Sequence, residues 1–361
     1  MIKGVLSQVI IFLLLVLFIA LLPSERFATT YGHLPCKTMR FIDSRTGWIA
    51  GDDGLYRTQN AGLTWVPLNE GFPTPADTQY QPYRLNDAFF INAHVGWVVS
   101  AYGKILKTTN GGLSWIDQTS NALKAVSNGR AESKFYRLRF VNDRVGWILG
   151  YTYDGMKSQK GSPYESTFLL RTPDGGVSWD RTDIKHLSAF PNIQFLDELN
   201  GWLFEPKMIL KTYDGGYSWV PQIISNNSSI NDLIFIDSKN GWAVDEHGKV
   251  FHTNDGGSSW LRKHFGNYLL KRVYFSDLKN GWIVGLLKKK SGSFESILFG
   301  TKDGGKSWKV QYRELYKTLI PFFINSQEGW LLVNDNLVSH EANEYKLFYT
   351  SDGGDNWNPL F

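Results

Sequence analysis

Acidic side chains recur at one position of a repeated turn, and a carboxylate is a group that can bind a metal ion or transfer a proton. The turn reads Thr-x-Asp-Gly-Gly-x-Ser-Trp or a close variant, and its acids are Asp174, Asp214, Asp255, Asp303 and Asp352. Two further copies carry an amide instead, Asn60 and Asn110. An amide still accepts hydrogen bonds from the backbone of its own turn, whereas catalysis or metal binding would not tolerate the exchange so easily. We therefore predict that these side chains are structural.

The remaining acids and the histidines form no recognisable catalytic pattern. Glycoside hydrolysis usually needs two carboxyl groups that face each other across the sugar. The sequence does not show whether any two of the acids predicted in loops and turns lie close together. These acids are Asp154, Glu165, Glu205, Asp245, Glu246, Glu295 and Asp335. The seven histidines are scattered, and no phosphate-binding loop or cluster of metal ligands stands out. We predict no catalytic, cofactor-binding or metal-binding residue, and the single cysteine, Cys36, excludes an intramolecular disulfide.

Basic residues gather in three segments predicted to be loops. They are Lys288, Lys289 and Lys290, then Lys157 and Lys160, and finally Lys124 with Arg130. Together they would form a basic rim that binds an acidic segment of a protein partner or anionic lipid headgroups. Solvated loop tips are the alternative. The net charge of the chain is only +4 and is widely spread, which argues against a nucleic-acid-binding surface.

The elements that would position these residues follow from the fourteen tryptophans, which fall into two alternating motifs. The first motif is an apolar strand, a short turn and Gly-Trp, and its tryptophans are Trp48, Trp97, Trp147, Trp202, Trp242, Trp282 and Trp330. The second motif is the acidic turn, and it ends at Trp65, Trp115, Trp179, Trp219, Trp260, Trp308 and Trp357. Seven strict alternations indicate seven copies of one structural unit.

Each unit is predicted to contain four short antiparallel strands. In residues 232–262, three apolar segments are separated by turn residues, and Asn254 to Ser258 lead into a fourth segment. Residues 38–361 give roughly 46 residues per unit, which suits a propeller blade with inserted loops. The sequence therefore predicts an all-β, seven-bladed β-propeller over residues 38–361, preceded by an N-terminal hydrophobic helix.

The acidic turn resembles the Asp box, or BNR repeat, of sialidases, sortilin-type receptors and xyloglucan-degrading enzymes. Paired in each unit with Phe-x-Asp/Asn-x-x-x-Gly-Trp, it resembles the seven-bladed propeller of photosystem II stability and assembly factors. This resemblance covers residues 38–361. It implies a non-enzymatic propeller that holds a protein partner during the assembly or maintenance of a membrane complex.

The Asp box leaves a second function open, a glycoside hydrolase or carbohydrate-binding module like the sialidases and xyloglucanases. Sialidases have six blades and a Phe/Tyr-Arg-Ile-Pro signature. The nearest segments are Tyr83-Arg84-Leu85-Asn86 and Tyr136-Arg137-Leu138-Arg139, and both lack the proline. Paired carboxylates with arginines around the central channel would favour the hydrolase, and a basic rim without such a pair would favour partner binding. A surface receptor or adhesion protein is a third reading.

The lengths of the connections predict one structural face and one working face. Both tryptophan motifs occupy turns at the same end of the strands and hardly vary in length. The long insertions all belong to the other end, at 66–87, 116–135, 151–167, 286–295 and 334–344. Variable loops on a rigid scaffold are where binding usually occurs.

The N-terminus predicts export. Residues 5–22 are apolar except for Ser7 and Gln8, and Lys3 precedes them. We favour an uncleaved signal anchor over a cleaved signal peptide within residues 1–28, followed by a linker at 29–37. The propeller is then expected on the non-cytoplasmic side of a membrane, as a monomer with a protein partner and without cofactors.

Overall fold

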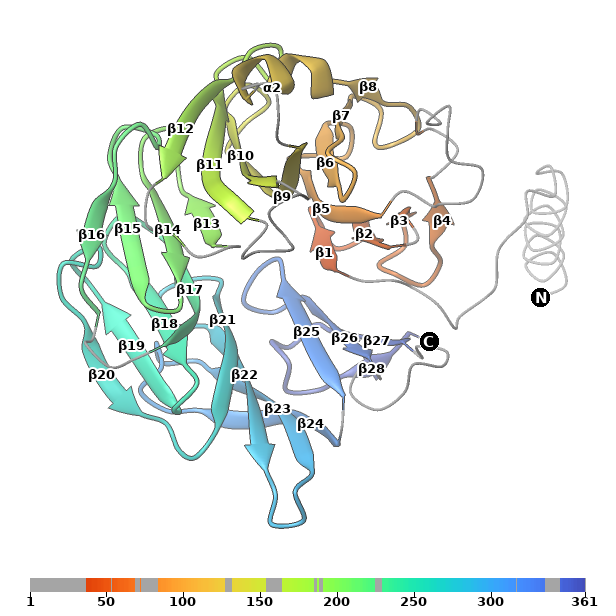
Figure 1. Ribbon diagram of the computed structural model, residues 1–361. Coiled ribbons are helices and arrows are strands. Elements are labelled where there is room, and N and C mark those ends of the chain that lie inside the picture. The colour runs from red at the N-terminus through yellow and green to blue at the C-terminus, as the bar shows by residue number, and fades with distance from the viewer. Residues whose placement is uncertain are drawn as a thin grey trace, which may run out of the picture. The chain divides into compact units, whose positions relative to one another are not determined.

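The computed structural model describes residues 37–360 except 53, 69–71, 73–83, 127–131, 154–163, 185–186, 188–190, 225–228, 316 and 335–344. Seven four-stranded antiparallel sheets follow one another around a central channel (Figure 1). The prediction of a seven-bladed, all-β propeller is confirmed. The predicted N-terminal hydrophobic helix and the segment 5–22 lie outside the described residues. Among the described residues, no helix is long and apolar enough to cross a membrane.

Each blade uses four strands in chain order, with the first strand nearest the channel (Figure 1). Blades 1 and 2 contain β1 (Thr38–Phe41), β2 (Gly47–Gly51), β3 (Gly54–Thr58), β4 (Val66–Pro67), β5 (Leu85–Phe90), β6 (Gly96–Ser100), β7 (Ile105–Thr108) and β8 (Ile116–Asp117). Blades 3 and 4 contain β9 (Glu132–Phe140), β10 (Gly146–Tyr153), β11 (Tyr164–Thr172), β12 (Asp180–Ile184), β13 (Asn192–Phe195), β14 (Gly201–Glu205), β15 (Met208–Thr212) and β16 (Val220–Gln222).

The last three blades follow the same order. They contain β17 (Ile230–Phe235), β18 (Gly241–Asp245), β19 (Lys249–Thr253), β20 (Leu261–His264), β21 (Leu269–Phe275), β22 (Gly281–Lys288), β23 (Phe294–Thr301), β24 (Lys309–Leu315), β25 (Thr318–Phe323), β26 (Gly329–Asn334), β27 (Tyr345–Thr350) and β28 (Asn358–Pro359). All seven sheets have four strands of their own, and among the described residues blade 7 takes all its strands from the C-terminal end of the chain.

Two of the predicted loop insertions contain regular secondary structure. The insertion at 286–295 is mostly an extension of β22 and β23, which pair as far as Lys288 with Phe294. The connection after blade 2 contains a helix that the sequence analysis missed, α2 (Thr119–Val126). Asp117 accepts a hydrogen bond from the Thr119 amide at 2.8 Å, which caps the start of this helix.

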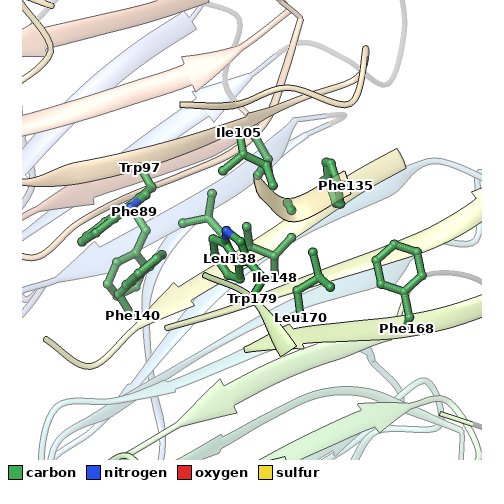
Figure 2. Close-up of a cluster of buried hydrophobic side chains, with 12 residues drawn as sticks. Phe89, Trp97, Ile105, Phe135, Leu138, Phe140, Ile148, Phe168, Leu170 and Trp179 are labelled. Carbon is green, nitrogen blue, oxygen red and sulfur yellow. The ribbon is translucent and has the colours of Figure 1, made fainter. Parts of the chain in front are cut away.

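The tryptophan of every Gly-Trp motif stacks on a phenylalanine of the next blade. The phenylalanine ends the first strand of its blade, and the ring centroids lie 3.5–3.8 Å apart in all seven pairs. The pairs are Trp48–Phe90, Trp97–Phe140, Trp147–Phe195, Trp202–Phe235, Trp242–Phe275, Trp282–Phe323 and Trp330–Phe41. The hydrophobic core is therefore divided among the junctions between blades, and Figure 2 shows the cluster between blades 2 and 3.

The glycine before each of these tryptophans is required by the same phenylalanine ring. In blade 5, a β-carbon on Gly241 would lie 2.6 Å from the ring of Phe235, and the corresponding distance at Gly146 to Phe140 is 2.2 Å. No side chain fits in that space without moving the ring. The Phe-x-Asp/Asn-x-x-x-Gly-Trp motif thus has one steric cause, because the phenylalanine covers the glycine of its own blade and stacks on the tryptophan of the preceding blade.

The ring closes with the same contacts that join its internal blades. Trp330 of blade 7 stacks on Phe41 of blade 1, with ring centroids 3.6 Å apart. Its indole Nε1 donates a hydrogen bond to the Ala61 carbonyl at 2.7 Å. The internal junction between blades 3 and 4 has the matching bond from Trp147 to Gly215, also at 2.7 Å.

The acidic turns are closed by hydrogen bonds to their carboxylates. In blade 5, Asp255 accepts bonds from the Ser259 amide at 2.9 Å and from the Ser259 hydroxyl at 2.5 Å. In blade 2, Asn110 accepts from the Ser114 amide and donates to the Ser114 hydroxyl, so the amide reproduces both contacts with one direction reversed. Each turn also donates to the first turn of its blade, as Gly256 does to Lys239. Both turns therefore lie on one face of the ring, which we call the box face.

The closure junction is expected to be as strong as an internal one. Replacing Trp330 by alanine removes a fully buried indole and should lower the free energy of unfolding by about 3–5 kcal/mol. Trp147→Ala is the matched control, because Trp147 has an equivalent stack and bond. Urea denaturation of both variants should give losses that agree within about 0.5 kcal/mol. A clearly smaller loss for Trp330→Ala would contradict closure by a full-strength junction.

The Asp boxes should make the protein sensitive to acid. Hydrogen bonds from Ser259, Ser307 and Asn356 lower the pKa of Asp255, Asp303 and Asp352 from 3.8 to about 2. A depressed pKa in the folded state contributes stability that is present above 3.8 and is lost as the pH falls through about 2. The triple variant Asp255→Asn, Asp303→Asn and Asp352→Asn should therefore lose less stability than wild type between these pH values. Urea unfolding at a series of pH values tests this, and parallel curves would contradict it.

Candidate functional site

The first strands of the blades line two adjoining cavities of about 640 and 320 Å³ in the central channel. Side chains alternate along these strands, so the residues one and three positions before the stacked phenylalanine face the channel. The nearer positions are Arg40, Phe89, Arg139, Gln194, Ile234, Tyr274 and Phe322. The farther positions that line the cavities are Thr38, Arg137, Asn192, Asp232, Arg272 and Ile320.

Positive charge predominates in the channel. Among the described residues, the cations that line the two cavities are Lys37, Arg40, Arg137, Arg139, Lys271 and Arg272. The only carboxylate among the lining residues is Asp232. The equivalent position in blade 2 is occupied by Asp87. Its side chain is 1% exposed and is covered by arginines rather than open to the cavity. The paired carboxylates that would favour a hydrolase are therefore not found facing each other in the described channel.

Several of these polar groups join neighbouring first strands. Asp87 accepts hydrogen bonds from the Ala88 and Leu138 amides at 3.0 and 3.1 Å, and Asp232 accepts from the Val273 amide at 3.0 Å. A first strand is the inner edge of its sheet, and its unpaired backbone groups need partners. These carboxylates supply such partners, which gives them a structural role.

Other members of the channel ring serve in the same way. The Gln194 side chain exchanges two hydrogen bonds with the backbone of Phe235, at 2.6 and 2.9 Å. Tyr274 donates its hydroxyl to the Phe323 carbonyl at 2.6 Å. These contacts, like those of the carboxylates, cross from one blade to the next, so polar residues in the channel also hold the ring together.

Two arginines lie against an aromatic ring on the box-face side of the channel. Arg40 donates to the Phe90 carbonyl at 3.0 Å, and its guanidinium lies 3.8 Å from the Phe89 ring centroid. Arg139 lies 5.9 Å from the same centroid and donates to Asp87 at 2.9 Å. Burial and the nearby Arg139 charge lower the pKa of Arg40 to about 10. The positive charges are thus crowded together and poorly compensated.

Three further cations lie toward the other face, and two of them have no such structural bonds. Lys271 and Arg272 are exposed, and no hydrogen bond or ion pair is found for either within the described part of the chain. Arg137 lies 3.8 Å from Asp87, and its buried Nε has no hydrogen-bond partner among the described residues. Lys271 and Arg272 can therefore meet an anionic ligand without breaking contacts that hold the blades, and Arg137 can donate its unused Nε while it stays near Asp87.

Burial raises the pKa of Asp232, and the Arg272 charge opposes that shift. A nearby positive charge favours the ionised carboxylate, whereas low solvent access disfavours it. Among the described residues, Asp232 is the one lining carboxylate beside six lining cations. The positive charge of the channel exceeds what this single carboxylate can neutralise. The channel can therefore attract a carboxylate or phosphate group of a ligand.

The basic rim predicted from the sequence is only partly described. Lys157, Lys160 and Arg130 lie outside the described residues. Lys124 is exposed on α2 after blade 2, whereas Lys288, Lys289 and Lys290 lie at the tip of the blade 6 hairpin. Lys289 pairs with Glu295 at 3.4 Å. Blades 3 to 5 separate the two described groups around the ring, so they do not form one cluster.

Of the acids considered as hydrolytic groups, Asp245 and Glu295 are buried and paired with lysines. Glu246 is exposed in a turn, while Asp154 and Asp335 lie outside the described residues. Among the described residues, no group of three His, Cys, Asp or Glu side chains could hold a metal ion. The channel cations Arg40, Arg137, Arg139 and Arg272 were not predicted as a site. Aligning the seven copies on the stacked phenylalanine shows them as charges in otherwise apolar strands.

Comparison with known proteins supports the resemblance to photosystem II assembly factors. Residues 171–270 match a family described as photosynthesis system II assembly factor YCF48. The photosystem II stability/assembly factor HCF136, chloroplastic, of Arabidopsis thaliana is 29% identical over 107 residues. This match covers 29% of the present chain and 25% of the relative, so it spans only about a quarter of that protein.

Two solved structures extend the likeness to nearly the whole propeller. A structure entitled "YCF48 bound to D1 peptide" has a TM-score of 0.60 at 16% identity and covers 90% of this chain and 92% of its own. YCF48 from Cyanidioschyzon merolae has a TM-score of 0.58 at 16% identity and covers 88% of this chain and 97% of its own. At this identity the likeness shows the fold. The predicted resemblance to a seven-bladed photosystem II assembly factor is confirmed.

The structural and the free cations of the channel should respond differently to mutation. Arg139→Gln leaves the buried Asp87 carboxylate with only Arg137 at 3.8 Å, and should lower the free energy of unfolding by about 2–3 kcal/mol. Arg272→Gln removes an exposed charge and should change the free energy of unfolding by less than about 0.5 kcal/mol.

Adding Asp87→Asn to Arg139→Gln is the internal control. The amide removes the uncompensated charge while retaining an acceptor for the Leu138 amide, so part of the lost stability should return. Urea denaturation of the variants measures this coupling. Equal losses for Arg139→Gln and Arg272→Gln would contradict the division into structural and free cations.

Proposed function

We propose that this protein is a non-enzymatic propeller that binds an acidic segment of a protein partner at the mouth of its central channel. The partner would belong to a membrane complex whose assembly or maintenance the propeller assists. The observation that carries this function is the excess of cations in the channel, where six positive side chains accompany one lining carboxylate among the described residues.

The arrangement of the cations toward the other face supports an extended ligand rather than a single small ion. Arg137, Lys271 and Arg272 come from blades 3 and 6, so they contribute from different sides of the channel. Asn192 and Asn231 line the same cavity and offer amide groups that can bond to a peptide backbone. A segment with spaced carboxylates would meet several of these groups at once.

The resemblance to assembly factors supports the choice of a protein ligand. One relative of the same fold has been solved with a D1 peptide bound, which makes peptide recognition a reasonable expectation for this scaffold. The site on this chain is inferred from its own channel residues.

Export and membrane tethering complete the proposal. Residues 5–22 form an apolar segment of a length at the lower limit for a membrane span, with Lys3 before it. A propeller held at the membrane surface would meet protruding segments of membrane proteins at a raised effective concentration.

Binding can be tested with the full chain in mild detergent and a fluorescein-labelled hexapeptide of alternating glutamate and glycine. We expect a dissociation constant that rises with salt, because the attraction is electrostatic. Arg137→Gln and Arg272→Gln should each weaken binding about three- to tenfold. Lys288→Gln is the matched control on the predicted rim and should leave binding unchanged.

The outcomes separate the two basic regions. A peptide with glutamine in place of glutamate should not bind measurably. Loss of binding in Lys288→Gln with normal binding in both arginine variants would move the site from the channel to the rim. Equal binding of the two peptides would refute recognition of acidic segments.

The glycoside hydrolase remains the alternative function, because arginines are present in the channel. A retaining or inverting mechanism needs two available carboxyl groups, and Asp87 is covered while Asp232 is bonded to the Val273 amide. Chromogenic glycosides incubated with the full chain should release no dye above a buffer blank. Turnover that disappears in Asp232→Asn would establish the hydrolase instead.

A further inference from the structure

The tips of the seven Asp boxes differ in polarity around the ring. The tip is the residue after the second glycine of the box, and in chain order the tips are Leu63, Leu113, Val177, Tyr217, Ser258, Lys306 and Asp355. The first four are apolar or aromatic and exposed, whereas the last three are polar. The box face was predicted to be purely structural, and scaffold geometry does not account for this difference.

At two junctions the tip contacts the residue that follows the box tryptophan of the preceding blade. Between blades 3 and 4, the Tyr217 hydroxyl donates to Asp180 at 3.0 Å. Between blades 6 and 7, Lys309 lies 3.5 Å from Asp355. These two junctions are closed by polar contacts, and they define the neighbours at every equivalent junction.

At the first two junctions the equivalent pairs are aliphatic. By their positions in the repeat, they are Val66 with Leu113 and Ile116 with Val177. We name the apolar arc as Leu63, Val66, Leu113, Ile116, Val177 and Tyr217. It runs over blades 1 to 4 on the outer part of the box face, and its side chains are 51–66% exposed.

The exposed area is large for a surface with no partner. At this exposure each side chain leaves on the order of 80 Å² of apolar surface in water, or about 500 Å² in all. This is near the upper end of the patches found on ordinary monomers. With the polar residues around it, the arc approaches the roughly 800 Å² per partner of a standard protein interface.

We infer that the apolar arc is the interface of a two-fold dimer of this chain. A two-fold axis through the middle of the arc places blade 1 of one copy opposite blade 4 of the other. The first turn of blade 1 carries exposed Arg45 and exposed Asp43, whose carboxylate accepts hydrogen bonds from the Arg45 and Thr46 amides. The first turn of blade 4 carries exposed Asp197 and Glu198. The blade 4 end of the arc is therefore the more negative one, and Arg45 is the group of the blade 1 turn that can pair with it in such a dimer.

The box sequences agree with this arrangement. Blades 1 and 2 carry Asn60 and Asn110 where the other five boxes carry an acid, so the boxes opposite blades 3 and 4 add no negative charge. A lipid bilayer is the other large apolar surface in reach of a tethered protein. Asp197 and Glu198 at one end of the arc would be repelled by anionic headgroups, which favours a second copy as the occupant.

Sedimentation velocity of the full chain in mild detergent tests the dimer. The wild type should sediment as a dimer at micromolar concentration. Leu113→Asp should raise the dimer dissociation constant at least tenfold, because the two-fold interface buries two introduced charges, one from each copy. Ser258→Asp is the matched control at the equivalent, exposed tip of blade 5 and should leave the dimer unchanged.

The charge pairing can be tested separately. Arg45→Glu and Glu198→Arg should each weaken the dimer, and the double variant should recover it. Near-ultraviolet circular dichroism of the tryptophans verifies that each variant is folded.

Two results would overturn the inference. One is a monomeric wild type, including one whose arc is protected from hydroxyl-radical labelling by liposomes of anionic lipid, which would identify a bilayer as the occupant. The other is a dimer that survives Leu113→Asp, which would place the interface elsewhere on the chain.

Discussion

The stack of one tryptophan on the phenylalanine of the next blade is the interaction on which this propeller depends. It occurs at all seven junctions with nearly the same separation, including the closure between blades 7 and 1. Two large aromatic groups are covered at each junction, all of them buried except the partly buried Phe195, and neither group can be buried by a blade on its own. The fold is therefore stable only as a closed ring, and the glycine before each tryptophan is the steric requirement for closing it.

The aromatic stacks fill the space between neighbouring blades. The inner edge of each first strand, with its unpaired backbone groups, therefore faces the channel. The unpaired backbone groups of that edge explain why Asp87, Gln194 and Asp232 lie there. In the described part of the propeller, cations such as Arg272 make no hydrogen bond of this kind, so the fold does not explain their presence in the channel. The cations available to a ligand are thus those that do not bond to neighbouring blades. They are recognised by comparing their hydrogen bonds with those of the other channel residues.

The sequence was sufficient to predict the fold because each blade repeats its own steric signature. It was not sufficient to locate the channel site. Arg137 and Arg139 were seen only as an incomplete sialidase signature, because the direction of a side chain in a short strand depends on register. Bulges at Asn231 and Lys271 shift that register within β17 and β21. The helix α2 was also missed, since eight residues span only about two helical turns and give too short a pattern to recognise.

The divergence among equivalent positions carries the functional information in a repeat protein, as the third strands also illustrate. The residue before the threonine of each box is Arg57, Lys107, Arg171 or Lys211 in blades 1 to 4, but His252, Gly300 or Tyr349 in blades 5 to 7. Lys107 and Lys211 donate to a glycine carbonyl of the next box at 3.1 and 3.0 Å. The half of the ring with these cations is the half with the apolar tips. Selection for a common fold would leave seven such positions interchangeable, so their division into two halves indicates that each half of the box face meets a different environment.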